Sequence, residues 1–174
     1  MLDLFCYTGG FAVHAALGGA GSLTAADIKE DWLVLARRNM ELSGVAGAAE
    51  FVKADAFELI KNLNKSNSTF DIIIVDPPSF AKSRHSVPAA MRGYEALNLG
   101  AMKLLNPGGI LATFSCSHSM TNESFAAMIK GCAAKASKRL TILKRCHQAP
   151  DHPIVRAIPE TEYLKGYFLR VSNS

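Results

Sequence analysis

The chain opens with Leu2-Asp3-Leu4-Phe5-Cys6-Tyr7-Thr8-Gly9-Gly10-Phe11, a strand-like apolar run followed by a glycine turn and the start of a helix. Glycine lets the backbone of such a turn approach a ligand closely, because it has no Cβ. The amides of the helix start then face a carboxylate or a phosphate. The dinucleotide fingerprint Gly-x-Gly-x-x-Gly is absent, since Phe5 and Tyr7 stand where it requires glycine. The stretch therefore predicts a ligand-binding strand–turn–helix unit with little room for a pyrophosphate.

Short apolar runs alternate with longer amphipathic stretches in the rest of the chain, which predicts a parallel sheet covered by helices. We expect seven strands at Met1–Phe5, Ser22–Asp27, Glu50–Lys53, Asp71–Val75, Gly109–Ser115, Thr141–Cys146 and Tyr163–Arg170. The count is typical of the α/β class I fold of S-adenosylmethionine (SAM)-dependent methyltransferases, a Rossmann-like, mostly parallel sheet with helices on both faces. A classic dinucleotide-binding fold also fits on architecture alone, so the fold does not settle the function.

Two of the expected helices show a clear apolar face. In the helix after Asp27, which can cap its start, the residues near one face are Ile28, Trp32, Leu35, Ala36 and Met40. In the later helix they are Phe125, Met128, Ile129, Cys132, Ala133 and Ala136. We expect these faces, including the Cys132 thiol, to lie in the core.

Length and charge limit the class of protein. A chain of 174 residues suits a single domain, residues 1–174, and its apolar runs are far shorter than a membrane span. Residues 1–77 contain 6 Lys/Arg and 10 Asp/Glu, whereas residues 78–174 contain 13 and 5. The basic second half suits a polyanion such as RNA, although an ordinary solvated surface would look the same. Scattered cysteines without metal-ligand spacing predict a cytoplasmic protein with free thiols and no metal site.

Acidic residues occur at three successive strand ends. Asp3 lies in the first run, Asp27 ends the second, and Asp55-Ala56 follows the third. The first segment resembles motif I of SAM methyltransferases, which predicts that Asp3 receives the ammonium of the methionine part. Asp27 is placed to accept hydrogen bonds from both ribose hydroxyls, and Asp55-Ala56 to lie near the adenine amino group. Each acid alone is equally explained as a helix cap, but the three together predict SAM as cofactor.

The fourth run, Asp71–Val75, ends in Asp76-Pro77-Pro78-Ser79-Phe80. Prolines stiffen this exit and bias Asp76 toward an extended conformation. The motif resembles motif IV of nucleic-acid base methyltransferases, where a carboxylate, backbone carbonyls and an aromatic ring receive a base taken out of its stack. By itself it favours methylation of an exocyclic amine.

Cys116 changes that interpretation, because it lies in Thr113-Phe114-Ser115-Cys116-Ser117 at the end of the fifth run. A thiolate that adds to carbon 6 of a pyrimidine makes carbon 5 nucleophilic, whereas an amine target needs no thiol. The fourth and fifth strands should be neighbours, so Cys116 and Asp76 are expected to face one pocket as catalytic residues. Such a thiol needs a lowered pKa; the candidate activators are His118, Arg92 and Lys82. A small buried cysteine is the alternative.

These segments together resemble one family. They are, in order, Phe5-Cys-Tyr-Thr-Gly-Gly-Phe11, Asp76-Pro-Pro-Ser-Phe80, Arg92-Gly-Tyr94, Thr113-Phe-Ser-Cys-Ser117, Ala149-Pro-Asp-His-Pro153, Pro159-Glu160 and Tyr163-Leu-Lys-Gly166. They are similar to the catalytic domain of the bacterial large-subunit ribosomal RNA cytosine-5 methyltransferases that carry an N-terminal PUA domain. The resemblance implies Cys116 as nucleophile, SAM as methyl donor and 23S ribosomal RNA as partner.

The residue roles that we expect from the motifs and the resemblance form two groups. The cofactor-binding residues are Asp3, Phe5, Tyr7, Thr8, Gly9, Gly10, Asp27, Asp55, Ala56 and Asp76. The substrate-binding residues are Pro77, Pro78, Phe80 and Arg92.

The chain departs from the pattern in two respects: Pro78 occupies the place where another branch of RNA cytosine-5 methyltransferases has a second cysteine, and the 174 residues contain no PUA domain or β-rich linker. Methylation of a guanine or adenine nitrogen, and a non-catalytic SAM- or RNA-binding fragment, are the alternatives.

Overall fold

The computed structural model describes residues 1–80 and 87–173. Its strands form one seven-stranded sheet in the order β3-β2-β1-β4-β5-β7-β6. Their bounds are β1 Leu2–Asp3, β2 Leu23–Asp27, β3 Ala49–Lys53, β4 Phe70–Val75, β5 Leu105–Ser115, β6 Lys138–Cys146 and β7 Lys165–Asn173. The pairs from β3 to β5 are parallel, and β7 runs antiparallel between β5 and β6. The predicted seven-stranded, mostly parallel sheet is therefore confirmed.

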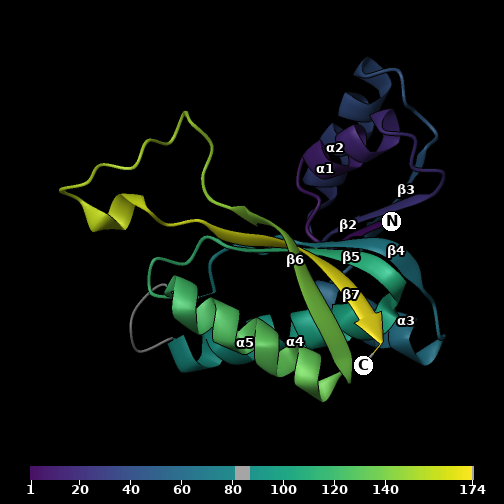
Figure 1. Ribbon diagram of the computed structural model, residues 1–174. Coiled ribbons are helices and arrows are strands. Elements are labelled where there is room, and N and C mark those ends of the chain that lie inside the picture. The colour runs from purple at the N-terminus through teal and green to yellow at the C-terminus, as the bar shows by residue number, and fades with distance from the viewer. Residues whose placement is uncertain (81–86, 174) are drawn as a thin grey trace.

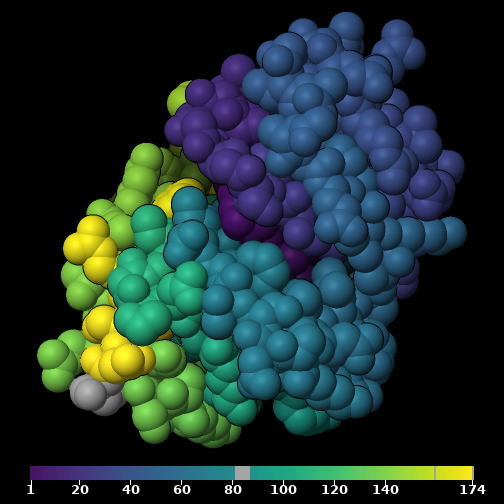
Figure 2. Space-filling model, turned by 90° about the vertical axis from the view of Figure 1, so that its right-hand side faces the viewer, coloured from purple at the N-terminus to yellow at the C-terminus, as the bar shows by residue number. Residues whose placement is uncertain are grey.

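Helices cover both faces of this sheet (Figure 1). On one face lie α1 (Gly10–Leu17) and α2 (Glu30–Leu42); on the other lie α3 (Ala56–Lys65), α4 (Val87–Leu104) and α5 (Asn122–Lys135). A short 3-10 helix, η2 (Pro159–Thr161), lies in the long connection between β6 and β7. Figure 2 shows the first third of the chain, in purple and blue, above most of the teal, green and yellow residues that follow.

The main core lies between the sheet and α3–α5. Ile73 and Val75 of β4 and Leu111 of β5 are completely or almost completely buried there. Phe125 and Cys132 of α5 face the same core, as the spacing of that helix predicts. Ile74, which points to the opposite face of β4, joins a smaller cluster. The central strand is thus buried on both faces, as expected for a parallel sheet.

The expected apolar face of α2 is only partly correct. Ala36 and Met40 are buried, and so is Leu33, which takes the place that we assigned to Leu35. Ile28 is 60% exposed, and with Trp32 it lines a cleft next to the helix. The sequence pattern cannot distinguish apolar side chains that pack on the sheet from those that line a ligand site.

Some boundaries also differ from the predicted ones. The expected cap of α2 is wrong: the helix begins at Glu30 after Lys29, and Asp27 instead accepts hydrogen bonds from the backbone N–H groups of Lys29 and Tyr7, each at 3.0 Å. β1 ends at Asp3, two residues early, because the chain turns there toward α1. β5 starts at Leu105, before a register irregularity that accommodates the turn at Gly108.

Two helix glycines offer a matched test of the packing between α3 and α4. A Cβ at Gly100 of α4 would overlap Cγ2 of Ile60 in α3, whereas a Cβ at Gly131 of α5 would meet no atom within 4 Å. We expect Gly100→Ala to lower the free energy of unfolding by about 1–3 kcal/mol through overpacking. Gly131→Ala should raise it by up to about 1 kcal/mol through helix propensity.

Urea unfolding followed by circular dichroism measures both free energies. Ile60→Ala removes the methyl group that the new Cβ would overlap. In that background, Gly100→Ala should therefore cost little free energy of unfolding relative to Ile60→Ala alone. Equal stabilisation by the two glycine substitutions would contradict the close contact between α3 and α4.

Candidate functional site

The largest cleft near the predicted residues lies at the carboxyl ends of the parallel strands, where open α/β sheets bind ligands. It has a volume of about 640 Å³. Its lining consists of Leu4, Phe5, Tyr7, Asp27, Ile28, Lys29, Trp32, Ala54, Asp55, Ala56, Phe57, Asp76, Pro77, Pro78, Phe80, Cys116, Tyr163 and Leu164. The structure thereby brings together most of the residues that the sequence assigns to cofactor, substrate and catalysis.

The turn between β1 and α1 forms one end of this cleft. Its backbone is held by hydrogen bonds from the N–H of Cys6 to the carbonyl of Ala26 at 2.9 Å and from the N–H of Tyr7 to Asp27 at 3.0 Å. Gly9 has a positive φ of 81°, and a Cβ there would lie 3.0 Å from Cβ of Ala36. Glycine is therefore required at this position by both backbone conformation and space.

A second hollow of about 320 Å³ lies on the other side of the same turn. It is lined by Phe5, Cys6, Tyr7, Thr8, Gly10, Phe11, His14 and Asp76. Phe5, Tyr7 and Asp76 line both hollows. Residues of the turn thus line both hollows.

The acids at the strand ends are held in different ways. Each oxygen of Asp27 accepts one backbone N–H, which fixes the carboxylate while leaving lone pairs for a ligand. Asp55 is exposed and caps α3 by accepting the N–H groups of Phe57 and Glu58. The helix-cap interpretation of Asp55 is therefore correct; both Asp55 and Ala56 nevertheless line the cleft.

Asp3 lies directly beneath the turn and is only 1% exposed. Among the described residues, neither of its carboxyl oxygens has a hydrogen-bond partner at a normal distance and angle. Burial raises its pKa to about 7, and the nearby charges of Asp76 and Asp27 contribute to the rise, against the backbone N–H of Phe5. A buried carboxyl group without an ion-pair partner among the described residues favours the arrival of a cation. The ammonium and sulfonium groups of SAM match this requirement.

The other end of the cleft combines the exits of β4 and β5. Val75 pairs with Thr113, so Asp76 and the residues after Ser115 leave the sheet side by side. Cys116 is half-buried, and its Sγ lies 4.0 Å from the carbonyl oxygen of Pro77. Phe80 packs on Tyr94, with ring centroids 4.8 Å apart. The expected neighbourhood of Cys116 and Asp76 is confirmed.

The electrostatics of this end disfavour an ionised thiol. Burial raises the pKa of Asp76 to about 6. Burial, followed by the Asp76 charge, raises the pKa of the Cys116 thiol. The thiol is consequently protonated at neutral pH, and any role as a nucleophile requires that its environment change when substrate arrives.

Not every predicted residue reaches the cleft. Arg92 is exposed on α4 and is not part of the cleft lining, although its assignment to substrate stays a prediction. His118 is exposed and stacks near Tyr163, with ring centroids 5.6 Å apart. Lys82 lies outside the described residues. The candidate activators of the thiol therefore have no contact with it in the described part of the structure.

Three aromatic residues at the site have no role assigned by the sequence analysis, although Tyr94 and Tyr163 lie in segments that carry the family resemblance. Trp32 and Tyr163 line the cleft, and Trp32 lies edge-on to Tyr7, with ring centroids 4.6 Å apart. Tyr94 is completely buried behind Phe80, and its hydroxyl lies close enough to Cys116 and Asp76 to feel their charges. The resemblance of a segment does not tell which of its aromatic side chains line a site and which lie in the core.

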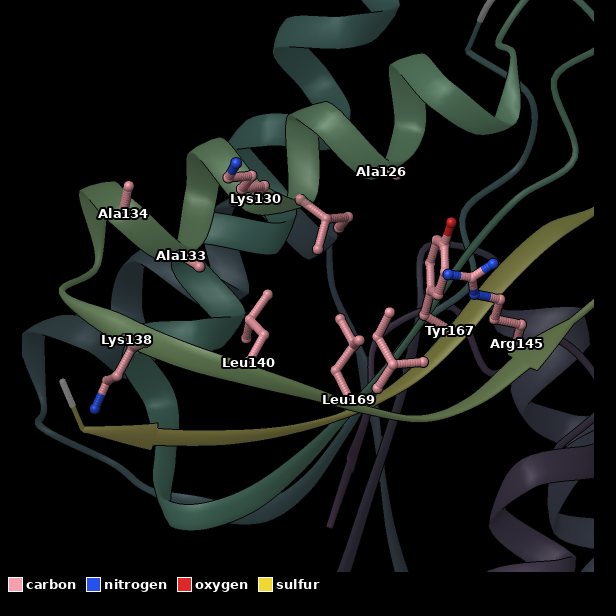
Figure 3. A pocket seen from close by; sticks show the side chains of 11 residues that line it. Ala126, Lys130, Ala133, Ala134, Lys138, Leu140, Arg145, Tyr167 and Leu169 are labelled. Carbon is pink, nitrogen blue, oxygen red and sulfur yellow. The ribbon is translucent and has the colours of Figure 1, made fainter.

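A separate apolar hollow of about 420 Å³ lies between α5 and the β6–β7 pair (Figure 3). Leu140, Tyr167 and Leu169 point from the strands toward α5. Its described lining includes the basic residues Lys130, Lys138 and Arg145 but none of the predicted site residues. It is therefore distinct from the candidate site. Within residues 1–80 and 87–173, the structure has no helix both long and apolar enough to cross a membrane.

Comparisons with known proteins agree with this geometry. The model of a family described as S-adenosylmethionine-dependent methyltransferase matches residues 1–167. A curated relative from Klebsiella pneumoniae, ribosomal RNA large subunit methyltransferase I, is 42% identical over 98% of this chain and 43% of its own length. The corresponding Salmonella arizonae protein is likewise 42% identical over the same shares of the two chains. The chain thus spans less than half the length of these relatives.

Solved structures show the same fold. A Streptococcus mutans protein described as a SAM-dependent methyltransferase superposes with a TM-score of 0.84 at 27% identity, over 97% of this chain and 43% of that one. A methyltransferase complexed with SAH superposes with a TM-score of 0.80, also at 27% identity, over 97% of this chain and 44% of that one. The class I methyltransferase fold is therefore confirmed.

The raised pKa of Asp3 predicts how cofactor affinity depends on pH. The carboxyl group ionises only as the pH rises through about 7, and a cationic ligand favours the ionised form. We expect the affinity for SAM to increase between pH 6 and pH 8. In Asp3→Asn, the increase should be much smaller, because only the titration of Asp76 near pH 6 remains. The affinity should also be about tenfold weaker at pH 8, since a charged contact contributes roughly 1.5 kcal/mol.

Isothermal titration calorimetry measures these affinities. Glu50→Gln, which removes an exposed charge on β3, is the control and should retain the wild-type profile. An equal pH dependence in wild type and Asp3→Asn would show that Asp3 does not contribute to binding.

Proposed function

The chain belongs to the SAM-dependent methyltransferase family, and we propose that it transfers a methyl group to carbon 5 of a cytosine in ribosomal RNA through a covalent adduct with Cys116. The observation that supports this most directly is the position of the Cys116 thiol on the wall of the cleft, with Sγ 4.0 Å from the carbonyl of Pro77. The name of the 42% identical relative supports large-subunit ribosomal RNA, hence 23S RNA in bacteria, as the substrate.

The cofactor would bind across the β1–α1 turn. Asp27, fixed by two backbone amides, would hold the ribose hydroxyls; Asp55 and Ala56 would lie at the adenine end. The residues of the turn, Phe5, Tyr7, Thr8, Gly9 and Gly10, would surround the methionine part, with Asp3 beneath it. When bound, SAM supplies an electrophilic methyl group on its sulfonium. No metal is needed for this reaction, and a cytoplasmic location stays a prediction.

The thiol solves the problem that carbon 5 of cytosine is a poor nucleophile. The Cys116 thiolate forms a bond to carbon 6, and the electrons of the carbon 5–carbon 6 double bond move to carbon 5. Carbon 5 then takes the methyl group, leaving S-adenosylhomocysteine. Carbon 5 loses its proton to solvent, the bond between sulfur and carbon 6 breaks, and the ring double bond forms again. The thiolate is returned unchanged.

Asp76 has the properties required to assist the addition. Its pKa of about 6 lets it exchange a proton near neutral pH. In this account, the proton leaves the thiol for Asp76 and passes on to nitrogen 3 of the cytosine. While Asp76 holds this proton, it lacks the negative charge that opposes the thiolate; once the proton is on nitrogen 3, carbon 6 is more electrophilic. Nitrogen 3 returns the proton to Asp76 when the bond between sulfur and carbon 6 breaks. Pro77, Pro78 and Phe80 would hold the base in place, with Arg92 as a further substrate contact.

The motif Asp76-Pro77-Pro78-Ser79-Phe80 also supports a second candidate, methylation of a guanine or adenine nitrogen in RNA. That reaction polarises an amine with a carboxylate and a backbone carbonyl and leaves Cys116 without a role. A chain that binds SAM or RNA without catalysis is the third alternative. The atom that carries the new methyl group separates these possibilities.

We expect Cys116→Ala to abolish methylation of cytosine carbon 5 by the full-length gene product. Without the thiol, carbon 5 cannot become nucleophilic, so activity should fall by at least about 10³-fold, in the range typical of losing a nucleophile. The measurement is transfer of labelled methyl groups from SAM to 23S ribosomal RNA, with the modified atom mapped by mass spectrometry.

Cys146→Ala is the matched control, because Cys146 ends β6 and lies outside the cleft lining. It should retain activity. Methylation of carbon 5 by Cys116→Ala would refute the adduct, and a methyl group found on a purine nitrogen would establish the second candidate.

A further inference from the structure

Lys165 is a lysine buried next to the proposed nucleophile. It is the first residue of β7 and only 4% exposed. Its strand partner is Ser115, the last residue of β5, and Cys116 follows directly. A lysine is almost never fully buried unless its charge has a use or a partner. Its position at the exit of β5 therefore requires an explanation that the cofactor site does not provide.

The ammonium of Lys165 connects two segments of the cleft wall. Nζ donates one hydrogen bond to the carbonyl of Ser117 at 2.6 Å and another to the carbonyl of Tyr163 at 2.7 Å. Ser117 directly follows Cys116, and Tyr163 lines the cleft on the β7 side. Both contacts fix backbone, so Lys165 holds the loop that carries Cys116 against the segment that enters β7.

The positive charge of Lys165 is not neutralised by these contacts. Carbonyl groups are neutral acceptors, and no ion pair with a carboxylate within 4 Å is found for Lys165 among the described residues. The charged or titratable groups near it are Cys116 and, farther along the same segment, Glu162. Those near the Cys116 thiol are Asp76, Tyr94 and Lys165. Lys165 is the one cation in this described group.

We propose that Lys165 is a positioning residue and the counter-ion of the Cys116 thiolate: its ammonium joins the backbone after Cys116 to the segment that enters β7 and supplies the positive charge against which the thiolate forms. This inference rests on the proposed role of Cys116 as nucleophile. The opposing effects of Asp76 and Lys165 on the thiol then have separate functions. The ionised Asp76 favours the protonated thiol, and Lys165 stabilises the thiolate once Asp76 is neutralised.

The directions in which Cys116 and Lys165 shift each other's pKa are consistent with this assignment. The Lys165 charge lowers the pKa of Cys116, against the larger effects of burial and Asp76. Burial lowers the pKa of Lys165, whereas the Cys116 and Glu162 charges raise it. The thiolate and the ammonium therefore stabilise each other's charged forms, as the two members of an ion pair do.

The test measures how readily the Cys116 thiol ionises, and it does not depend on methyl transfer. The rate at which iodoacetamide alkylates Cys116 is followed from pH 6 to pH 10 by peptide mass spectrometry, which resolves Cys116 from the other three cysteines. Lys165→Met removes the charge at similar side-chain length, and Lys165→Gln keeps an N–H donor without charge. We expect both to move the midpoint of the profile to higher pH by about one unit, which makes alkylation about tenfold slower at pH 7.5.

Lys165→Arg keeps the charge and should remain close to wild type. Lys144→Met, which removes an exposed lysine from the neighbouring strand β6, is the matched control and should not shift the profile. Circular dichroism establishes that each variant is folded. An unchanged profile in folded Lys165→Met or Lys165→Gln would overturn the proposal, as would an Arg variant as slow as the Met variant.

The outcome is independent of the proposed reaction, because alkylation needs neither SAM nor RNA. If Cys116→Ala still methylates carbon 5, the proposed function fails whatever Lys165 does. If Cys116→Ala is inactive and the neutral Lys165 variants show a wild-type profile, only the role of Lys165 fails.

Discussion

Strand β5 pairs in parallel with β4 and antiparallel with β7, and the position of the candidate chemistry depends on this double pairing. The parallel pair brings the exits of β4 and β5 to the same edge, so Asp76 and Cys116 meet there. The antiparallel pair brings the start of β7, rather than its end, to that edge, which places Lys165 opposite Ser115. A cation, a thiol and a carboxylate thereby arrive from three strands at one wall of the cleft.

The charges of the site are divided between its two ends. Asp3, Asp27 and Asp76 are close enough for their charges to interact. Burial, together with the charges of Asp76 and Asp27, raises the pKa of Asp3 to about 7. This end favours the cationic groups of the cofactor. The wall at Cys116 contains the buried ammonium of Lys165, which favours an anion. Asp76 lies between the two and lines both hollows, so its state of protonation affects both ends.

The sequence predicts the sheet well because its strands are short apolar runs that end in recognisable chemistry. Asp27, Asp76 and Cys116 were expected at strand ends, and each lines the cleft. The sequence predicts less well where a residue can satisfy two physical requirements. Asp55 caps α3 and also faces the cleft, and Ile28 looks like a core residue until the cleft beside α2 is seen.

Lys165 shows that the local sequence pattern does not reveal a residue whose burial depends on long-range strand pairing. The sequence places it in the expected last strand and in the segment Tyr163-Leu-Lys-Gly166 without indicating a role, and its burial depends on β7 inserting between β5 and β6. This insertion is a long-range pairing without a local signal in residues 163–170. The expected apolar face is confirmed for Cys132, which lies in the core with its thiol against α4, but not for Ile28, because helical spacing does not distinguish a core residue from one that lines a cleft.

The central claim is that Cys116 bonds covalently to carbon 6 of the target cytosine. The most direct measurement is mass spectrometry of the full-length gene product after reaction with SAM and ribosomal RNA that contains 5-fluorocytosine. Because fluorine at carbon 5 cannot leave as a proton does, the last elimination is blocked and the adduct accumulates. The account predicts a stable protein–RNA complex whose cross-linked peptide contains Cys116. Methylated RNA without any such complex, or a cross-link at another residue, would contradict it.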